Sequence, residues 1–90
     1  MEYRGTLITV MDEVQVTSSF RKREFVVSDN DDKYPQEVIF QLSQDRCDAI
    51  QHFSVGDEVV VSFNLRGRRW ESPNGVKFFN SLDAWKVDRV

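Results

Sequence analysis

Apolar and polar residues alternate along most of this chain, as they do in strands that bury one face and expose the other. In DEVVVSFNLR, residues 57–66, the residues that would point to one side are Val59, Val61, Phe63 and Leu65. FRKREFVVS (20–28) and YPQEVIFQL (34–42) alternate in the same way. Their inward positions would be Phe25, Val27, Val38, Phe40 and Leu42. The pattern therefore predicts three strands in the middle of the chain.

Two further strands are predicted near the ends of the chain. RGTLITVMDEVQV, residues 4–16, is apolar on both faces over residues 7–11, which is typical of a strand that pairs on both sides and bends. Gly5 would permit the bend. The last predicted strand runs from Lys77 to about Val87.

One segment departs from the alternation. SQDRCDAIQHFSVGD, residues 43–57, places apolar residues at three-residue spacing, which predicts the buried face of a short helix. These residues are Cys47, Ile50 and Phe53. Ser43 or Asp45 could cap the start of the helix, and Gly56 would mark the return to extended chain.

The resulting order is three strands, a helix and two strands within a single domain, residues 1–90. This order predicts an all-β OB-fold, a five-stranded Greek-key barrel with one short helix between strands 3 and 4. A small sandwich and an SH3-like barrel are the alternatives, and the helix after the third strand favours the OB-fold.

The composition is that of an ordinary globular protein, with 40% hydrophobic and 30% charged residues. No run of about 20 apolar residues could span a membrane. The apolar patch near the N-terminus is too short for a signal peptide. The single cysteine, Cys47, cannot form an internal disulfide. These features lead us to expect a cytoplasmic protein without a membrane partner.

The net charge is −3, but the charges are segregated along the chain. Residues 18–26 carry three cations against Glu24, and residues 63–80 carry four cations against Glu71. The stretch SDNDD, residues 28–32, carries three carboxylates. In an OB barrel the loops after strands 1 and 4 flank one binding face. We therefore expect the two basic segments to converge at one cleft and the acidic turn to lie elsewhere.

Cations interleaved with aromatic residues are the chemistry that holds single-stranded nucleic acid. Cations follow the phosphates, and bases stack on flat side chains for about 1–3 kcal/mol each, whatever the base. Arginine suits both roles because its guanidinium is planar and charged. The sequence thus predicts largely sequence-independent binding of single-stranded DNA, with RNA left open and no cofactor. The predicted nucleic-acid-binding residues are Phe20, Arg21, Lys22, Arg23, Arg66, Arg68, Arg69, Trp70, Lys77, Phe78 and Phe79.

Three stretches resemble bacterial and phage single-stranded DNA-binding proteins and their short relatives: REFVV (23–27), VGDEVVVSFNLRGRRWE (55–71) and GVKFFNSLDAWKV (75–87). The resemblance implies an OB-fold that serves DNA replication and repair. It implies stacking or phosphate-binding roles for Phe20, Arg66, Arg68, Trp70, Phe78 and Phe79. The first strand differs in sequence from the usual N-terminal strand of that family, so the resemblance does not imply the family's tetramer for this chain. The sequence ends at Val90 without an acidic tail, so tail-mediated recruitment of partners is not carried over either.

Several of these residues also have structural interpretations. Trp70 could close the end of the barrel, and because Phe78 and Phe79 point to opposite faces, one of them should be core. Trp85 is expected to be structural, and Tyr34 could be exposed or buried. The core is expected to include Phe25, Phe40, Phe53 and Phe63. Arg21 and Arg23 could instead pair with Glu24, Glu37 or Asp57.

Other function classes have less support. Cys47 and His52 are five residues apart on the helix and do not face each other, and no Cys/His cluster has metal-ligand spacing. SDNDD lacks the glycine and distal glutamate of a calcium loop. We therefore expect a binding protein and not an enzyme. The alternative function is an OB-type protein-interaction module that forms a homodimer or higher homo-oligomer or acts as an accessory subunit.

Overall fold

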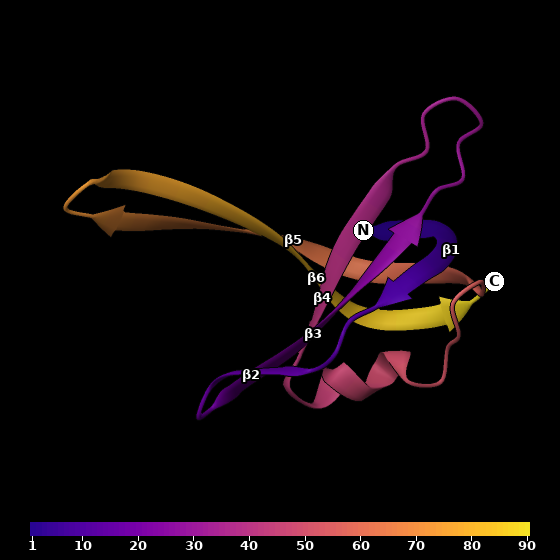
Figure 1. Ribbon diagram of the computed structural model, residues 1–90, viewed down its shortest axis with the longest axis horizontal. Coiled ribbons are helices and arrows are strands. Elements are labelled where there is room, and N and C mark those ends of the chain that lie inside the picture. The colour runs from indigo at the N-terminus through magenta and orange to yellow at the C-terminus, as the bar shows by residue number, and fades with distance from the viewer.

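The computed structural model describes all residues, 1–90, and consists mainly of strands (Figure 1). The strands are β1 (Glu2–Val10), β2 (Val14–Thr17), β3 (Phe20–Ser28), β4 (Glu37–Ser43), β5 (Glu58–Ser72) and β6 (Gly75–Arg89). A 3₁₀ helix, η1 (Gln44–Ile50), lies between β4 and β5. No helix has the length and hydrophobicity needed to cross a bilayer.

Five of the strands close into a barrel. β1 pairs with β5 through Glu2–Thr6 and with β3 through Thr6–Val10, so it joins the two ends of the sheet. The ring continues from β5 to β6, β4 and β3, and the β6–β4 contact is parallel. This is the strand order of an OB-fold, and the predicted fold is confirmed. The predicted first strand is divided, because residues 11–13 belong to no strand, and β2 only adds to the edge of β3.

Gly5 lies where β1 changes from one partner strand to the other. A Cβ atom at this position would overlap the backbone carbonyl of Ser28 on β3. The glycine therefore serves close approach of two backbones, in addition to the bend expected from the sequence. Without that approach β1 could not pair with β3, and the barrel would remain open.

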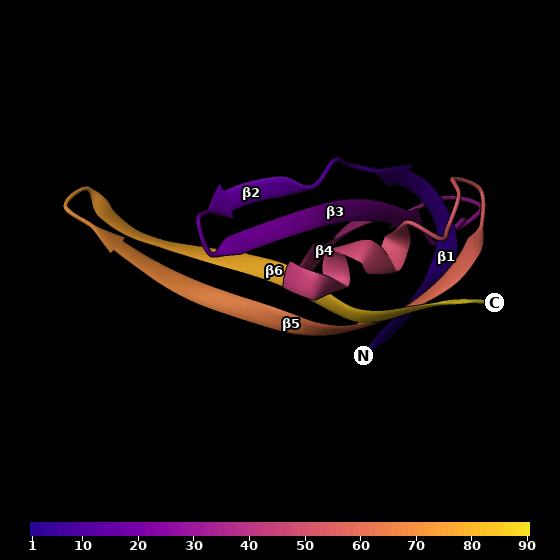
Figure 2. The same cartoon turned by 90° about the horizontal axis from the view of Figure 1, so that it is seen from below.

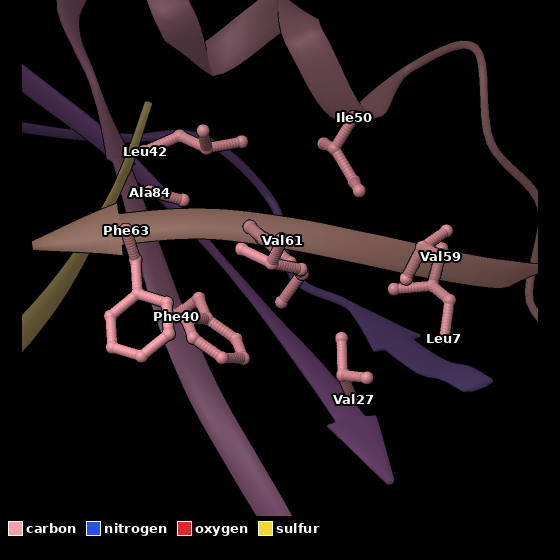
Figure 3. Packing of buried hydrophobic residues seen from close by; sticks show 10 residues of the cluster. Leu7, Val27, Phe40, Leu42, Ile50, Val59, Val61, Phe63 and Ala84 are labelled. Carbon is pink, nitrogen blue, oxygen red and sulfur yellow. The ribbon is translucent and has the colours of Figure 1, made fainter. Parts of the chain in front are cut away.

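The core is built around the aromatic rings of Phe25, Phe40 and Phe63, of which Figure 3 labels the last two. The ring centroids of Phe25 and Phe40 are 5.6 Å apart, and those of Phe40 and Phe63 are 5.1 Å apart. Aliphatic residues from β1, β3, β4, β5 and η1 surround them: Leu7, Val27, Leu42, Ile50, Val59 and Val61. Phe53 is only half-buried, with the Arg89 guanidinium 5.3 Å from its ring centroid. The alternation thus assigned the inward positions of these strands correctly, with the exception of Leu65, which lies beyond Phe63 and is exposed.

The helix η1 matches the three-residue spacing seen in the sequence. A 3₁₀ helix has three residues per turn, so Cys47 and Ile50 lie on one side, and both are fully buried. Ser43 occupies the N-cap position, but its side chain makes no capping hydrogen bond, contrary to one of the two expected caps. Gly56 adopts φ +102°, a left-handed conformation, as the chain returns to β5.

The acidic turn lies apart from the two hairpins that leave the barrel. Figures 1 and 2 show the β2–β3 and β5–β6 hairpins projecting to one side, and the loop after β3 at the other side. This loop is stabilised by its own carboxylates. Asp31 accepts hydrogen bonds from the backbone N–H groups of Tyr34 and Lys33, both at 2.9 Å, and these bonds lower the pKa of Asp31. Tyr34 belongs to this loop and is exposed.

We predict that Gly5→Ala destabilises the protein by about 1–3 kcal/mol or more, because β1 or β3 must shift to admit the methyl group. Gly67→Ala is the matched control, since a Cβ there would lie at an ordinary 3.6 Å from Asn80 Oδ1. Urea denaturation of the two variants measures the difference. Equal midpoints for both variants would contradict this explanation of Gly5.

We also predict a contribution of Asp57 to stability that depends on pH. Hydrogen bonds from the Ser54 N–H (2.9 Å) and the Arg89 guanidinium (3.1 Å) lower the pKa of Asp57 below the usual 3.8. The folded state then binds fewer protons than the unfolded state, so this stabilisation is complete above pH 3.8 and is lost as pH falls through the folded-state pKa. Asp57→Asn should flatten the acid limb of a thermal-unfolding profile. Asp32→Asn, which removes an exposed carboxylate without a hydrogen-bond partner, is the control.

Candidate nucleic-acid interface

The β5–β6 hairpin continues well beyond the barrel as a two-stranded arm (Figures 1 and 2). We define the arm as residues 64–83, which follow the last core pair, Phe63 and Ala84. The strands stay paired up to Ser72 and Gly75, so the turn itself is only Pro73 and Asn74. Gly75 adopts φ +132°, which favours glycine. Because the turn is so short, the two strands stay paired almost to the tip of the hairpin.

One face of the arm gathers cations and aromatic rings, and we call it the cationic face. Arg68 lies opposite Phe79, and Trp70 lies opposite Lys77. Residues directly opposite each other in an antiparallel pair share a face, and alternate residues along each strand share it too. The cationic face consists of Arg66, Arg68, Trp70, Lys77 and Phe79. An open hollow of about 410 Å³ is lined by Arg68, Trp70 and Phe79 alone.

The charges of this face are available for a ligand. Arg68 and Lys77 have no carboxylate within 4.0 Å. Arg66 lies 3.6 Å from Asp83, but its side chain is 64% exposed. Exposed pairs of this kind contribute only about 0–1 kcal/mol, so a phosphate can replace the carboxylate at little cost. The hollow is therefore flanked by two free cations and one weakly paired cation.

The opposite face, which we call the reverse face, has a different chemistry. Its residues are Leu65, Arg69, Glu71, Val76 and Phe78. Arg69 and Glu71 lie 3.5 Å apart and offset each other's charge. Leu65 and Phe78 are 58% and 73% exposed. This face is thus apolar with an internal ion pair.

The expectation that Phe78 or Phe79 belongs to the core is wrong, because both are exposed. Phe78 and Phe79 lie on the part of the arm that projects beyond the barrel, where no other element covers either face of the hairpin. Trp85, expected to be structural, is also exposed, at 46%. Ser62 pairs with Lys86 and Phe63 with Ala84, which leaves Trp85 as the extra residue of a bulge. Alternation along the sequence gives no signal for this bulge.

The first basic segment is largely engaged within the protein. The Arg21 guanidinium lies 3.0 Å from Glu13 and 3.5 Å from Asp45. Arg23 donates its Nε–H to the carbonyl oxygen of Met11 at 2.9 Å. The interpretation that Arg21 and Arg23 interact within the protein is therefore confirmed, but their partners are not the carboxylates that we expected. Asp57, one of the expected partners, pairs with Arg89.

Lys22 is the one cation of this segment that reaches the base of the arm. It lines a groove of about 470 Å³ between β3 and β4 on one side and residues 80–82 of β6 on the other. Its ammonium lies 3.8 Å from Glu24, which also lines the groove, as does Glu37. The structure therefore brings together Arg68, Trp70 and Phe79, and places Lys22 beside the arm's base. It does not bring Phe20, Arg21 or Arg23 to the hollow.

Comparison with known protein families gives one match. The profile of the family described as "Domain of unknown function (DUF3127)" matches residues 2–88. No match was found among curated proteins.

Comparison with solved structures identifies the fold. Rim1, the mitochondrial single-stranded DNA-binding protein of S. cerevisiae, superposes with a TM-score of 0.72 at 13% identity, over 100% of this chain and 92% of that one. The small single-stranded DNA-binding protein of Streptomyces coelicolor gives 0.61 at 16% identity, over 100% and 92% of the two chains. The Plasmodium falciparum SSB, in complex with ssDNA, gives 0.57 at 16%, over 98% and 88%. This chain therefore has the OB-fold of single-stranded DNA-binding proteins, as the sequence resemblance implied.

We predict that Phe78→Ala and Phe79→Ala each change the free energy of unfolding by no more than about 0.5 kcal/mol, because both rings are exposed on the arm. Phe25→Ala, at a fully buried position, should cost about 3–5 kcal/mol. Chemical denaturation of the three variants provides the comparison. A loss above about 2 kcal/mol for either arm variant would show that the arm packs on the barrel.

Proposed function

The chain belongs to the DUF3127 family and has the fold of single-stranded DNA-binding proteins, and from this premise we propose that it binds single-stranded DNA along the cationic face of its arm. The observation that carries the proposal is the hollow where Arg68, Trp70 and Phe79 meet, beside cations without carboxylate partners. The structural neighbours are single-stranded DNA-binding proteins, and one of them is in complex with ssDNA. Both observations support the same ligand.

The mechanism follows from the two kinds of side chain. A base enters the hollow and stacks on Trp70 or Phe79, while the Arg68 guanidinium pairs with a phosphate or stacks on the base. Arg66 and Lys77 engage the neighbouring phosphates. Stacking is available to every base, so binding depends little on sequence. RNA offers the same phosphates and rings, and DNA is the preferred ligand on the strength of the structural neighbours.

The proposal narrows the set of residues expected from the sequence. It assigns binding to Arg66, Arg68, Trp70, Lys77 and Phe79. Arg69 and Phe78 lie on the reverse face, and Arg21 and Arg23 are bound to protein groups. Such a protein would serve DNA replication or repair, where single strands are exposed, and its role is to hold DNA and not to react with it.

Fluorescence anisotropy with oligo-dT tests this proposal. We expect binding at low salt, with log affinity falling against log salt at a slope of about −2, as three phosphate contacts from Arg66, Arg68 and Lys77 require. Trp70→Ala should weaken binding about 5- to 150-fold, the equivalent of one stacked base. Arg68→Ala should weaken binding and also make the salt slope shallower by about 0.7.

The reverse face supplies matched controls. Phe78→Ala pairs with Phe79→Ala, and Arg69→Ala pairs with Arg68→Ala, since each control is adjacent in sequence but points to the other side of the arm. The controls should bind oligo-dT like the unmodified protein. Absence of binding at low salt, or equal losses on both faces, would disprove the proposal.

A further inference from the structure

The groove at the base of the arm lies where the barrel is least completely paired. β4 and β6 run parallel and pair at one position only, Gln41 with Asp83. Upstream of this pair the two strands separate, and residues 37–40 and 80–82 form the sides of the groove. The other edge of β4 pairs with β3, and the other edge of β6 pairs with β5. Each strand therefore presents an edge without a partner strand to the groove.

The groove is lined by four apolar residues and by two carboxylates against a single cation. The apolar residues are Val38, Ile39, Phe40 and Leu82. Ile39 is 46% exposed. Glu24 and Glu37 both line the groove, and the only cation, Lys22, lies next to Glu24. Glu37 has no cation within 4.0 Å. The lining thus carries a net negative charge and no arginine.

This chemistry suits a peptide better than a polynucleotide. Phosphates would meet uncompensated carboxylates, and the cations of the arm lie on its cationic face and not among the residues of the groove. An unpaired strand edge offers backbone N–H and C=O groups in alternation, which is the pattern that an extended peptide complements. Apolar side chains of such a peptide would cover Ile39 and Leu82, and a lysine or arginine would pair with Glu37.

We infer that the groove binds an extended segment of a partner protein, with alternating apolar and basic residues, which adds to the free edge of β4. The partner would lie at the base of the arm, away from the hollow lined by Arg68, Trp70 and Phe79. One molecule could then hold DNA on the arm and a protein at its base at the same time. This inference does not depend on the DNA-binding proposal.

Amide NMR spectra of the labelled protein, recorded with two separate probes, test the inference. The first probe is a short synthetic peptide of alternating lysine and valine, and the second is oligo-dT. We expect the peptide to shift the amide signals of residues 37–40 and 80–82. We expect oligo-dT to leave these signals in place and to shift those of residues 66–70 and 77–79.

A charge-reversal variant sharpens the test. Glu37→Lys should weaken binding of the lysine–valine peptide about three- to tenfold, because attraction becomes repulsion. Asp32→Lys makes the same change of charge in the loop after β3, outside the groove, and should have no effect. The dispersion of the spectra reports whether each variant is folded.

The outcomes separate the two ideas. If the peptide shifts no groove signal, or if a glutamate–valine peptide binds equally well, the inference is wrong. If oligo-dT shifts the groove signals, the groove binds nucleic acid and the inference is wrong as well. If instead oligo-dT leaves the signals of residues 66–70 and 77–79 unchanged while the lysine–valine peptide shifts those of the groove, the DNA-binding proposal fails and this inference stands.

Discussion

The structure depends on one strand that pairs with two others. β1 joins β5 through its first half and β3 through its second half, and this double pairing converts a sheet with two edges into a barrel. The exchange of partners requires two backbones to approach more closely at Gly5 than a side chain would allow. Once the ring is closed, Phe25, Phe40 and Phe63 are enclosed and form the centre of the core.

The way the barrel closes also explains why both faces of the arm are exposed, whereas the strands of the barrel bury one face. The barrel uses β5 as far as Phe63 and β6 from Leu82, which packs against the core, and outside these limits the two strands have no third layer to pack against. Each face of the arm is therefore exposed, and each can have its own chemistry. Cations and rings occupy one face, while apolar residues and the Arg69–Glu71 ion pair occupy the other.

The fold could be predicted from the sequence more completely than the positions of the site residues. Alternation identifies strands because a half-buried strand imposes a period of two, and the three-residue spacing of Cys47 and Ile50 identified the helix for a similar reason. Alternation does not report where a strand leaves the barrel, so it could not show that Phe78 and Phe79 are both exposed. Nor could it show that Arg21 reaches Asp45, since that contact is set by the packing of β3 against η1.

The length of the hairpin has a consequence for how such a protein can change over time. No side chain between Asn64 and Ser81 belongs to the buried core or packs against it, so substitutions in this stretch exert little influence on whether the barrel folds. Recognition and foldability are here carried by separate parts of a single hairpin, and ligand preference is free to diverge among descendants that keep one scaffold.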